Sequence, residues 1–130
     1  PNSHMRHTAY NDYAAQVRVR MFDEFGFPLH RIMKMGYGPL LFQENTTFVK
    51  EVRMNETIAV DCAAYALRRD KKIWKFRHQI FNSAGELACK IEVVGAFLDL
   101  KARKVVAPPK EIGDMLDKVP TTDDFEWFDK

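Results

Sequence analysis

Backbone amides and one glutamate are the groups in this sequence best suited to chemistry on a carbonyl. Thr8, Ala9 and Tyr10 stand where the first predicted helix begins. The first turn of a helix has free N–H groups and the positive end of the helix dipole, so these amides could stabilise a developing oxyanion. Glu44 lies in a mostly apolar or neutral stretch and could act as a general base or nucleophile if it faces this point. A strand glutamate that simply faces solvent is the alternative, because alternation alone does not fix its direction.

The histidines offer few further catalytic groups. His78 alternates with Phe76 and Ile80 on the apolar face of a predicted strand, which favours a hydrogen-bonded histidine in the core or at an interface. His30 stands in a predicted loop with no motif around it. His7 either caps the start of the helix or points to solvent. From the residues alone, none of these three is predicted to carry a reaction.

The cysteines and serines do not form recognisable sites. Cys62 and Cys89 both lie in apolar, strand-like runs and are predicted to be buried free thiols. Neither has a neighbour at metal-ligand spacing, so a zinc site is not predicted. Ser3 and Ser83 lack the nucleophile-elbow context of serine hydrolases. The sequence therefore predicts chemistry that needs no metal and no other cofactor.

Composition indicates one globular domain. The chain has 130 residues, of which 46% are hydrophobic and 29% charged, enough to bury a core without disulfides or metals. The net charge of +2 and the interleaved acids argue against nucleic acid as a partner, and the basic segment 68–72 is predicted to be a solvated hairpin tip. With no run of 18 apolar residues and no signal peptide, no membrane association is predicted and a cytoplasmic protein is expected.

A long helix is predicted from Tyr10 to Phe25. Its apolar residues recur at helical spacing, and its polar residues, Arg18 among them, are predicted mostly to face away from the core. Gly26 stands at the position of a helix C-cap, and Pro28 prevents continuation. The stripe expected to face the core comprises Tyr10, Tyr13, Ala14, Val17, Met21 and Phe25.

Beyond residue 39 the hydrophobic period changes from about 3.6 to 2, which predicts strands linked by hairpins. Around Gly95 both faces become apolar, which indicates a bend or a close backbone approach. A short amphipathic helix, 110–116, precedes an acidic, aromatic tail whose Trp127 and Phe128 are expected to dock on the domain or on a partner. One buried helix and a meandering sheet make an α+β domain. The predicted strands are 40–52, 57–67, 72–81 and 86–100.

At this point the chain resembles a known family, the hotdog acyl-CoA and acyl-carrier-protein thioesterases of the 4-hydroxybenzoyl-CoA thioesterase type. The resemblance covers nearly the whole chain, and it implies an antiparallel curved sheet wrapped around one long central helix. Residues 1–118 would form this domain, with a first strand upstream of Pro1, and residues 119–130 a C-terminal tail. The residues that carry the resemblance most clearly are the segment 4–13, Arg18, Phe22 and Gly26.

The same resemblance implies a set of site residues. Asn2 and His4 match the second and third members of the family motif Asp-x-Asn-x-His, whose aspartate would precede Pro1. The segment 3–5 also matches the remnant of a cleaved affinity tag, so both origins stay open. Arg6 and His7 depart from the two asparagines often found there. The implied catalytic residues are Asn2, His4 and Glu44, and the implied substrate-binding residues are His7, Thr8, Ala9 and Tyr10.

The resemblance implies hydrolysis of an acyl-CoA or acyl-carrier-protein (acyl-ACP) thioester to a free acid and a thiol. It requires no cofactor, and it implies a homodimer or homotetramer whose sites lie between subunits. A non-catalytic acyl-CoA-binding or assembly protein of the same fold is the alternative. A native aspartate directly before Pro1 would favour the enzyme.

Overall fold

A computed structural model describes residues 7–53 and 55–130 of the chain. The longest helix in this part is α1 (His7–Glu24), and two short helices accompany it, α2 (Leu29–Lys34) and α3 (Lys110–Leu116). The strands are β1 (Tyr37–Phe48), β2 (Ala59–Val60), β3 (Ala63–Arg68), β4 (Ile73–Phe81), β5 (Leu87–Asp99), β6 (Lys104–Val106) and β7 (Thr121–Phe128).

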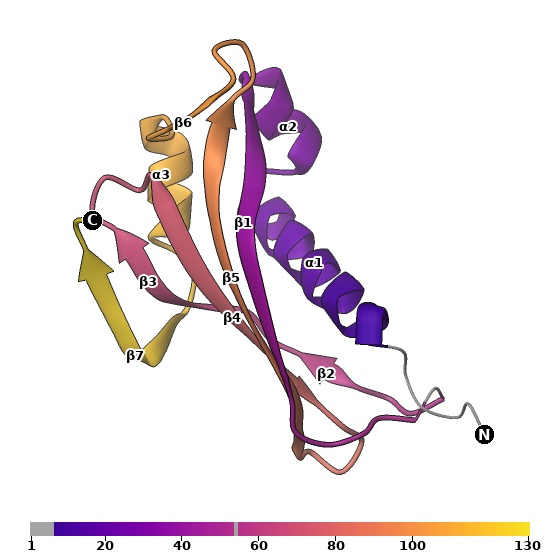
Figure 1. Cartoon of the computed structure of the whole chain (residues 1–130). Coiled ribbons are helices and arrows are strands. Elements are labelled where there is room, and N and C mark those ends of the chain that lie inside the picture. Colours follow the sequence, from indigo (N-terminus) through magenta and orange to yellow (C-terminus); the bar gives the residue numbers. More distant parts are fainter. Residues whose placement is uncertain (1–6, 54) are drawn as a thin grey trace.

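The strands form one curved sheet in the order β1-β5-β4-β3-β7, with β2 paired to β4 and β6 paired to β5. All pairs are antiparallel except β3 with β7, which run parallel. Figure 1 shows α1 lying along β1 at one side of the sheet, while β7 lies at the other edge. The predicted α+β class with a curved antiparallel sheet is confirmed except for the parallel pair of β3 and β7.

The second predicted strand is interrupted, and two strands were not predicted. Residues 57–67 form β2 and β3 with a break at Asp61, whose Oδ1 accepts a hydrogen bond from the Gln79 N–H at 2.6 Å. A side chain that occupies a neighbouring strand's N–H in this way competes with the ladder, which accounts for the break. Strand β6 was not predicted, and it extends the sheet because residues 104–106 pair with the end of β5.

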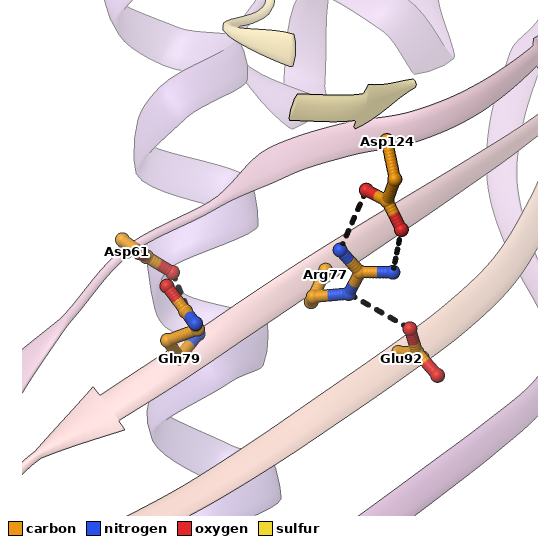
Figure 2. A network of polar contacts seen from close by, with 5 residues as sticks. All are labelled: Asp61, Arg77, Gln79, Glu92 and Asp124. Carbon is orange, nitrogen blue, oxygen red and sulfur yellow. Dashed lines mark hydrogen bonds and ion pairs between the residues drawn. The ribbon is translucent and has the colours of Figure 1, made fainter. Parts of the chain in front are cut away.

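The C-terminal segment lies in the same sheet as strand β7, and charged groups fasten it there. Arg77 donates from Nη1 and Nη2 to the two carboxylate oxygens of Asp124, at 2.9 and 3.0 Å, and from Nε to Glu92 at 2.8 Å (Figure 2). The Arg77 hydrogen bonds hold the pKa of Asp124 well below its usual range. The Lys75 ammonium lies 4.6 Å from the centre of the Phe128 ring. Together these contacts link β7 to the basic side chains of β4 across the intervening strand β3.

Helix α1 packs against the sheet with one face only. On this face, near the C-terminal end of the helix, the Phe22 ring lies 6.1 to 6.3 Å from the rings of Trp74, Phe76 and Phe97. Trp74 and Phe76 of β4 and Phe97 of β5 therefore cover this part of the helix. Val19 on the opposite face is 50% exposed, so the sheet of a single chain covers one side of the helix and does not enclose it. The prediction of a sheet wrapped around a central helix is therefore confirmed only for the face of α1 that packs on the sheet.

Two residues of α1 were assigned to the wrong face. Tyr13, predicted to face the core, is 40% exposed, and Arg18, predicted to face away, is only 8% exposed. The buried face runs through Tyr10, Ala14, Arg18 and Phe22, which is a strict four-residue spacing along the helix. The buried face of the helix therefore differs slightly from the predicted apolar stripe, because Arg18 has a hydrogen-bond partner, His78, in the sheet.

The close approach predicted at Gly95 is confirmed. Gly95 of β5 pairs with Trp74 of β4, and the indole lies directly over the glycine. A Cβ atom at position 95 would lie 2.2 Å from Trp74 Cη2, a distance that no relaxed side chain tolerates. The missing side chain of Gly95 is therefore what lets Trp74 lie flat in the core.

Gly95→Ala should destabilise the fold by about 1–3 kcal/mol or more, because the added methyl group displaces a buried indole. Gly113→Ala in α3 is the matched control, since its Cβ would meet Lys71 Cγ at an ordinary 3.5 Å. That control should be neutral or slightly stabilising, as alanine favours a helix. Urea unfolding followed by circular dichroism measures both variants, and equal midpoints would contradict the packing described here.

Candidate active site

The predicted catalytic residue Glu44 lies on β1, the strand that packs along α1. Thr46 on β1 and Asn11 on α1 are joined by a hydrogen bond from Thr46 Oγ1 to Asn11 Oδ1 of 3.0 Å. Two residues further along β1, the Phe48 ring meets the Tyr10 ring edge-on, with centroids 5.3 Å apart. Alternate residues of this part of β1 therefore face the N-terminal half of the helix.

Glu44 shares that face of β1. It lies two residues before Thr46, and the bulge in the β1–β5 ladder lies earlier, between Leu41 and Gln43. Its side chain is exposed. Burial lowers the pKa of Arg18 in the middle of α1, and the negative charge of Glu44 offsets a part of that shift. Because side chains alternate along a strand, Glu44 lies on the same side of β1 as Thr46, which contacts the helix.

The predicted binding residues at the start of α1 have unlike surroundings. His7 begins the helix and Thr8 is exposed, Ala9 is half-buried, and Tyr10 is buried in the core. Burial raises the pKa of the Tyr10 hydroxyl, which also forms a hydrogen bond with the backbone of Val52. Tyr10 therefore anchors the helix, and what the first turn can present to a ligand is its backbone amides.

Asn2 and His4 lie outside the described residues, and so does the side chain of His7. Their positions relative to Glu44 are therefore not described. Among the residues predicted to be catalytic, the structure places Glu44 alone.

A buried polar chain crosses the core behind this face. Arg18 Nη1 lies 3.0 Å from His78 Nε2, and His78 Nδ1 lies 2.8 Å from the backbone oxygen of Asp61. Arginine only donates, so Nε2 must accept and Nδ1 must carry the proton given to Asp61 O. Burial, aided by the Arg18 charge, lowers the pKa of His78 to about 4 and keeps the ring neutral. His78 is thus a hydrogen-bonded core histidine, as predicted.

The sequence interpretation missed Arg18 as a residue of the site. A usable signal was present, because Arg18 follows Ala14 by four residues and precedes Phe22 by four. That spacing places it on the buried face between two core residues. An arginine there needs an acceptor from elsewhere in the fold, and the histidine on the apolar face of β4 supplies it.

An apolar cavity of about 190 Å³ opens beside Arg18, between α1, α2 and the first half of β1. Its lining on β1 ends at Leu41, three residues before Glu44 on the same strand. Its lining is Ala15, Arg18, Val19, Phe22, Leu29, Ile32, Pro39, Leu40, Leu41 and Trp74.

Residues 1–116 match the family model of the thioesterase-like superfamily. The chain belongs to this superfamily. The match spans far more than half of the chain, and it includes α1, β1 and the cavity between them. The resemblance to hotdog thioesterases inferred from the helix-entry residues is confirmed at this level.

Solved structures share the fold of this superfamily member. A Staphylococcus aureus protein in complex with CoA is 23% identical, with a TM-score of 0.80 over 94% of this chain and 78% of that chain. A DHNA-CoA thioesterase from the same organism is 18% identical, with a TM-score of 0.80, covering 89% and 78%. A 1,4-dihydroxy-2-naphthoyl-CoA thioesterase from Synechocystis is 10% identical, with a TM-score of 0.79, covering 89% and 85%. No curated protein matches the sequence significantly.

Two further site types are absent from the part of the chain that the structure describes. Across residues 7–53 and 55–130, no three histidine, cysteine or acidic side chains gather where they could hold a metal ion. No helix within the same ranges has the length and apolar character needed to span a membrane.

The stability of this superfamily member should fall as pH drops from about 6.5 to 4. His78 is neutral in the fold with a pKa of about 4, whereas in the unfolded chain it titrates near 6.5. Between these two pH values the unfolded state binds more protons than the folded state. The stability that neutral His78 contributes is therefore fully present above pH 6.5 and is lost as the pH falls toward 4.

His78→Gln is the matched control, because glutamine can accept from Arg18 and donate to Asp61 but does not titrate. Urea titrations at half-unit pH steps should show a slope for the wild type of at most about 1.4 kcal/mol per pH unit from this group. A slope in this window that is the same in both proteins would show that His78 is not its source.

Proposed function

We propose that this protein hydrolyses an acyl thioester to a carboxylic acid and a thiol. The observation that carries the proposal is the juxtaposition, in a superfamily member, of an apolar cavity and the helix-facing carboxylate of Glu44 on the same strand. The cavity suits an acyl group, and the carboxylate suits activation of water.

In the proposed reaction, Glu44 takes a proton from a water molecule as that water attacks the thioester carbonyl. The oxyanion that forms is stabilised by backbone N–H groups of the first turn of α1, residues 7–10. Collapse of the tetrahedral intermediate breaks the carbon–sulfur bond, and the proton held by Glu44 passes to the leaving thiolate. Asn2 and His4 are proposed to orient the water and the carbonyl.

An acyl-CoA or an acyl-ACP is the proposed substrate, since both present a thioester on a long flexible arm. The similar Staphylococcus aureus structure in complex with CoA and the two similar CoA thioesterases favour CoA as the carrier. A second candidate function is a non-catalytic acyl-CoA-binding protein. The exposure of Glu44 is the observation that favours it, because a solvent-facing carboxylate need not be catalytic.

Glu44→Gln should lower kcat for acyl-CoA hydrolysis by about 10²-fold or more, because it keeps the shape of the side chain but cannot take a proton. Glu126→Gln on β7 is the matched control, since Glu126 is also an exposed strand glutamate but lies at the far edge of the sheet. Thiol release from a panel of acyl-CoAs, followed with a thiol reagent, measures both.

Full activity of Glu44→Gln would exclude Glu44 as the general base and would favour a carboxylate upstream of Pro1 in that role. Tight acyl-CoA binding without any thiol release from the wild type would favour the binding protein instead.

We also propose that the active unit is at least a dimer, formed through the α1, α2 and β1 side of the molecule. Strand β1 is the edge of the sheet, with backbone groups available for pairing. Among the described residues, seven of the exposed large hydrophobic side chains lie on or directly after these elements, and the eighth, Trp127, lies on β7. We propose that a second copy of the chain covers this apolar edge, because in a two-fold symmetric dimer the same surface of each subunit contacts its counterpart. The seven are Tyr13, Val19, Leu29, Met33, Phe42, Phe48 and Val49.

Light scattering at micromolar concentration should give at least twice the 15.1 kDa of one chain. Met33→Lys places a charge in the apolar surface and should shift the population toward monomer, since Met33 is 51% exposed there. Glu126→Lys adds a lysine at an exposed site on β7 and should leave the mass unchanged. A fully active wild-type monomer would contradict the proposal.

A further inference from the structure

The indole nitrogen of Trp74 is a buried donor without a partner. Trp74 is 1% exposed, and among the described residues its Nε1 has no hydrogen-bond partner. The rings packed against it belong to Phe22, Phe76 and Phe97, which offer no oxygen acceptor. Leaving such a donor unpaired is costly, and native proteins seldom do so without a reason.

Trp74 and Arg18 both line the cavity between α1, α2 and β1. Arg18 carries five N–H donors and a positive charge, and its bond to the neutral His78 supplies no counter-charge. Apart from these two residues, every side chain in the lining is aliphatic or aromatic and carries no polar atom. The two lining residues that carry polar side-chain atoms are therefore both hydrogen-bond donors, and the lining has no side-chain acceptor.

The size of the cavity limits what it can hold. An engineered cavity of about 150 Å³ in another protein binds benzene, so the 190 Å³ measured here suits a group of about six to eight non-hydrogen atoms. Trp74 forms part of the lining, and Gly95 leaves room beneath its ring. A much longer chain exceeds the volume of the cavity.

We propose that the cavity selects a short acyl group that carries an oxygen acceptor away from the thioester, with Trp74 and Arg18 as the specificity-determining donors. This inference rests on the proposed hydrolysis and narrows its substrate class. An acyl chain of the same length without the oxygen leaves the Trp74 donor unpaired and loses binding in the transition state. A long chain is excluded by the volume of the cavity.

The first test compares hexanoyl-CoA, 5-oxohexanoyl-CoA and decanoyl-CoA with the wild-type protein. The ketone accepts hydrogen bonds and cannot donate them, so it isolates the feature that the cavity is proposed to select. We expect kcat/KM for 5-oxohexanoyl-CoA to exceed that of the other two by about tenfold or more. Hydrolysis of all three at similar kcat/KM would overturn the inference and leave the proposed function standing.

Trp74→Phe removes the N–H group and keeps an aromatic ring, so the preference for the ketone over hexanoyl-CoA should shrink several-fold in this variant. Trp127→Phe is the matched control, because Trp127 lies on β7 away from the cavity and its replacement should leave the preference unchanged. A preference that is the same in Trp74→Phe and in the wild type, with both folded by circular dichroism, would exclude Trp74 as the selecting donor.

A binding measurement separates this inference from the hydrolysis itself. The chain has two tryptophans, so Trp127→Phe leaves Trp74 as the single indole fluorophore. Saturable change of its emission should occur with 5-oxohexanoate at lower concentration than with hexanoate. If no thioester is hydrolysed but this difference in binding is found, the proposed function fails and the cavity assignment stands. If neither acid changes the emission and no thioester is hydrolysed, both proposals fail.

Discussion

The contact between Arg18 and His78 joins α1 to the sheet through the core, and much of the rest depends on it. A buried guanidinium is tolerated only where acceptors meet it, and the imidazole must stay neutral to be one. His78 stays neutral because burial lowers its pKa, and its other nitrogen is held by the backbone oxygen of Asp61. The pair fixes which face of α1 turns inward, and so it brings Asn11 against Thr46 and the helix against the strand of Glu44.

Two asymmetries follow from this arrangement. Within the core, Trp74 lies flat over Gly95 and leaves a small cavity that α1, α2 and β1 close on the other sides. Across the sheet, the two edges differ in character, because β7 is fastened by the Arg77 and Asp124 pair whereas β1 is flanked by exposed apolar side chains. A second copy is therefore expected at the β1 edge, and that edge adjoins the proposed site.

Local periodicity predicted most of the secondary structure, and it erred where a distant partner intervened. The helix expected from Tyr10 to Phe25 spans His7–Glu24, and the third and fourth predicted strands match β4 and β5 closely. The second strand was predicted unbroken, because the residues around Asp61 do not indicate that its carboxylate accepts a hydrogen bond from the N–H of Gln79, 18 residues later. The tail was predicted to dock, but its pairing as a parallel strand depends on β3, about sixty residues earlier.

The sequence by itself determined the period of each element, the close approach at Gly95 and the place of His78 on an apolar strand face, since these follow from neighbouring residues. Only the tertiary structure decided that Arg18 is buried, because its acceptor is 60 residues away and charge alone predicts exposure. It also decided the cavity and the direction of Glu44, since a void and a strand face exist only once α1, α2 and β1 have packed. Hydrophobic pattern is local information, whereas the pairing of buried polar groups is not.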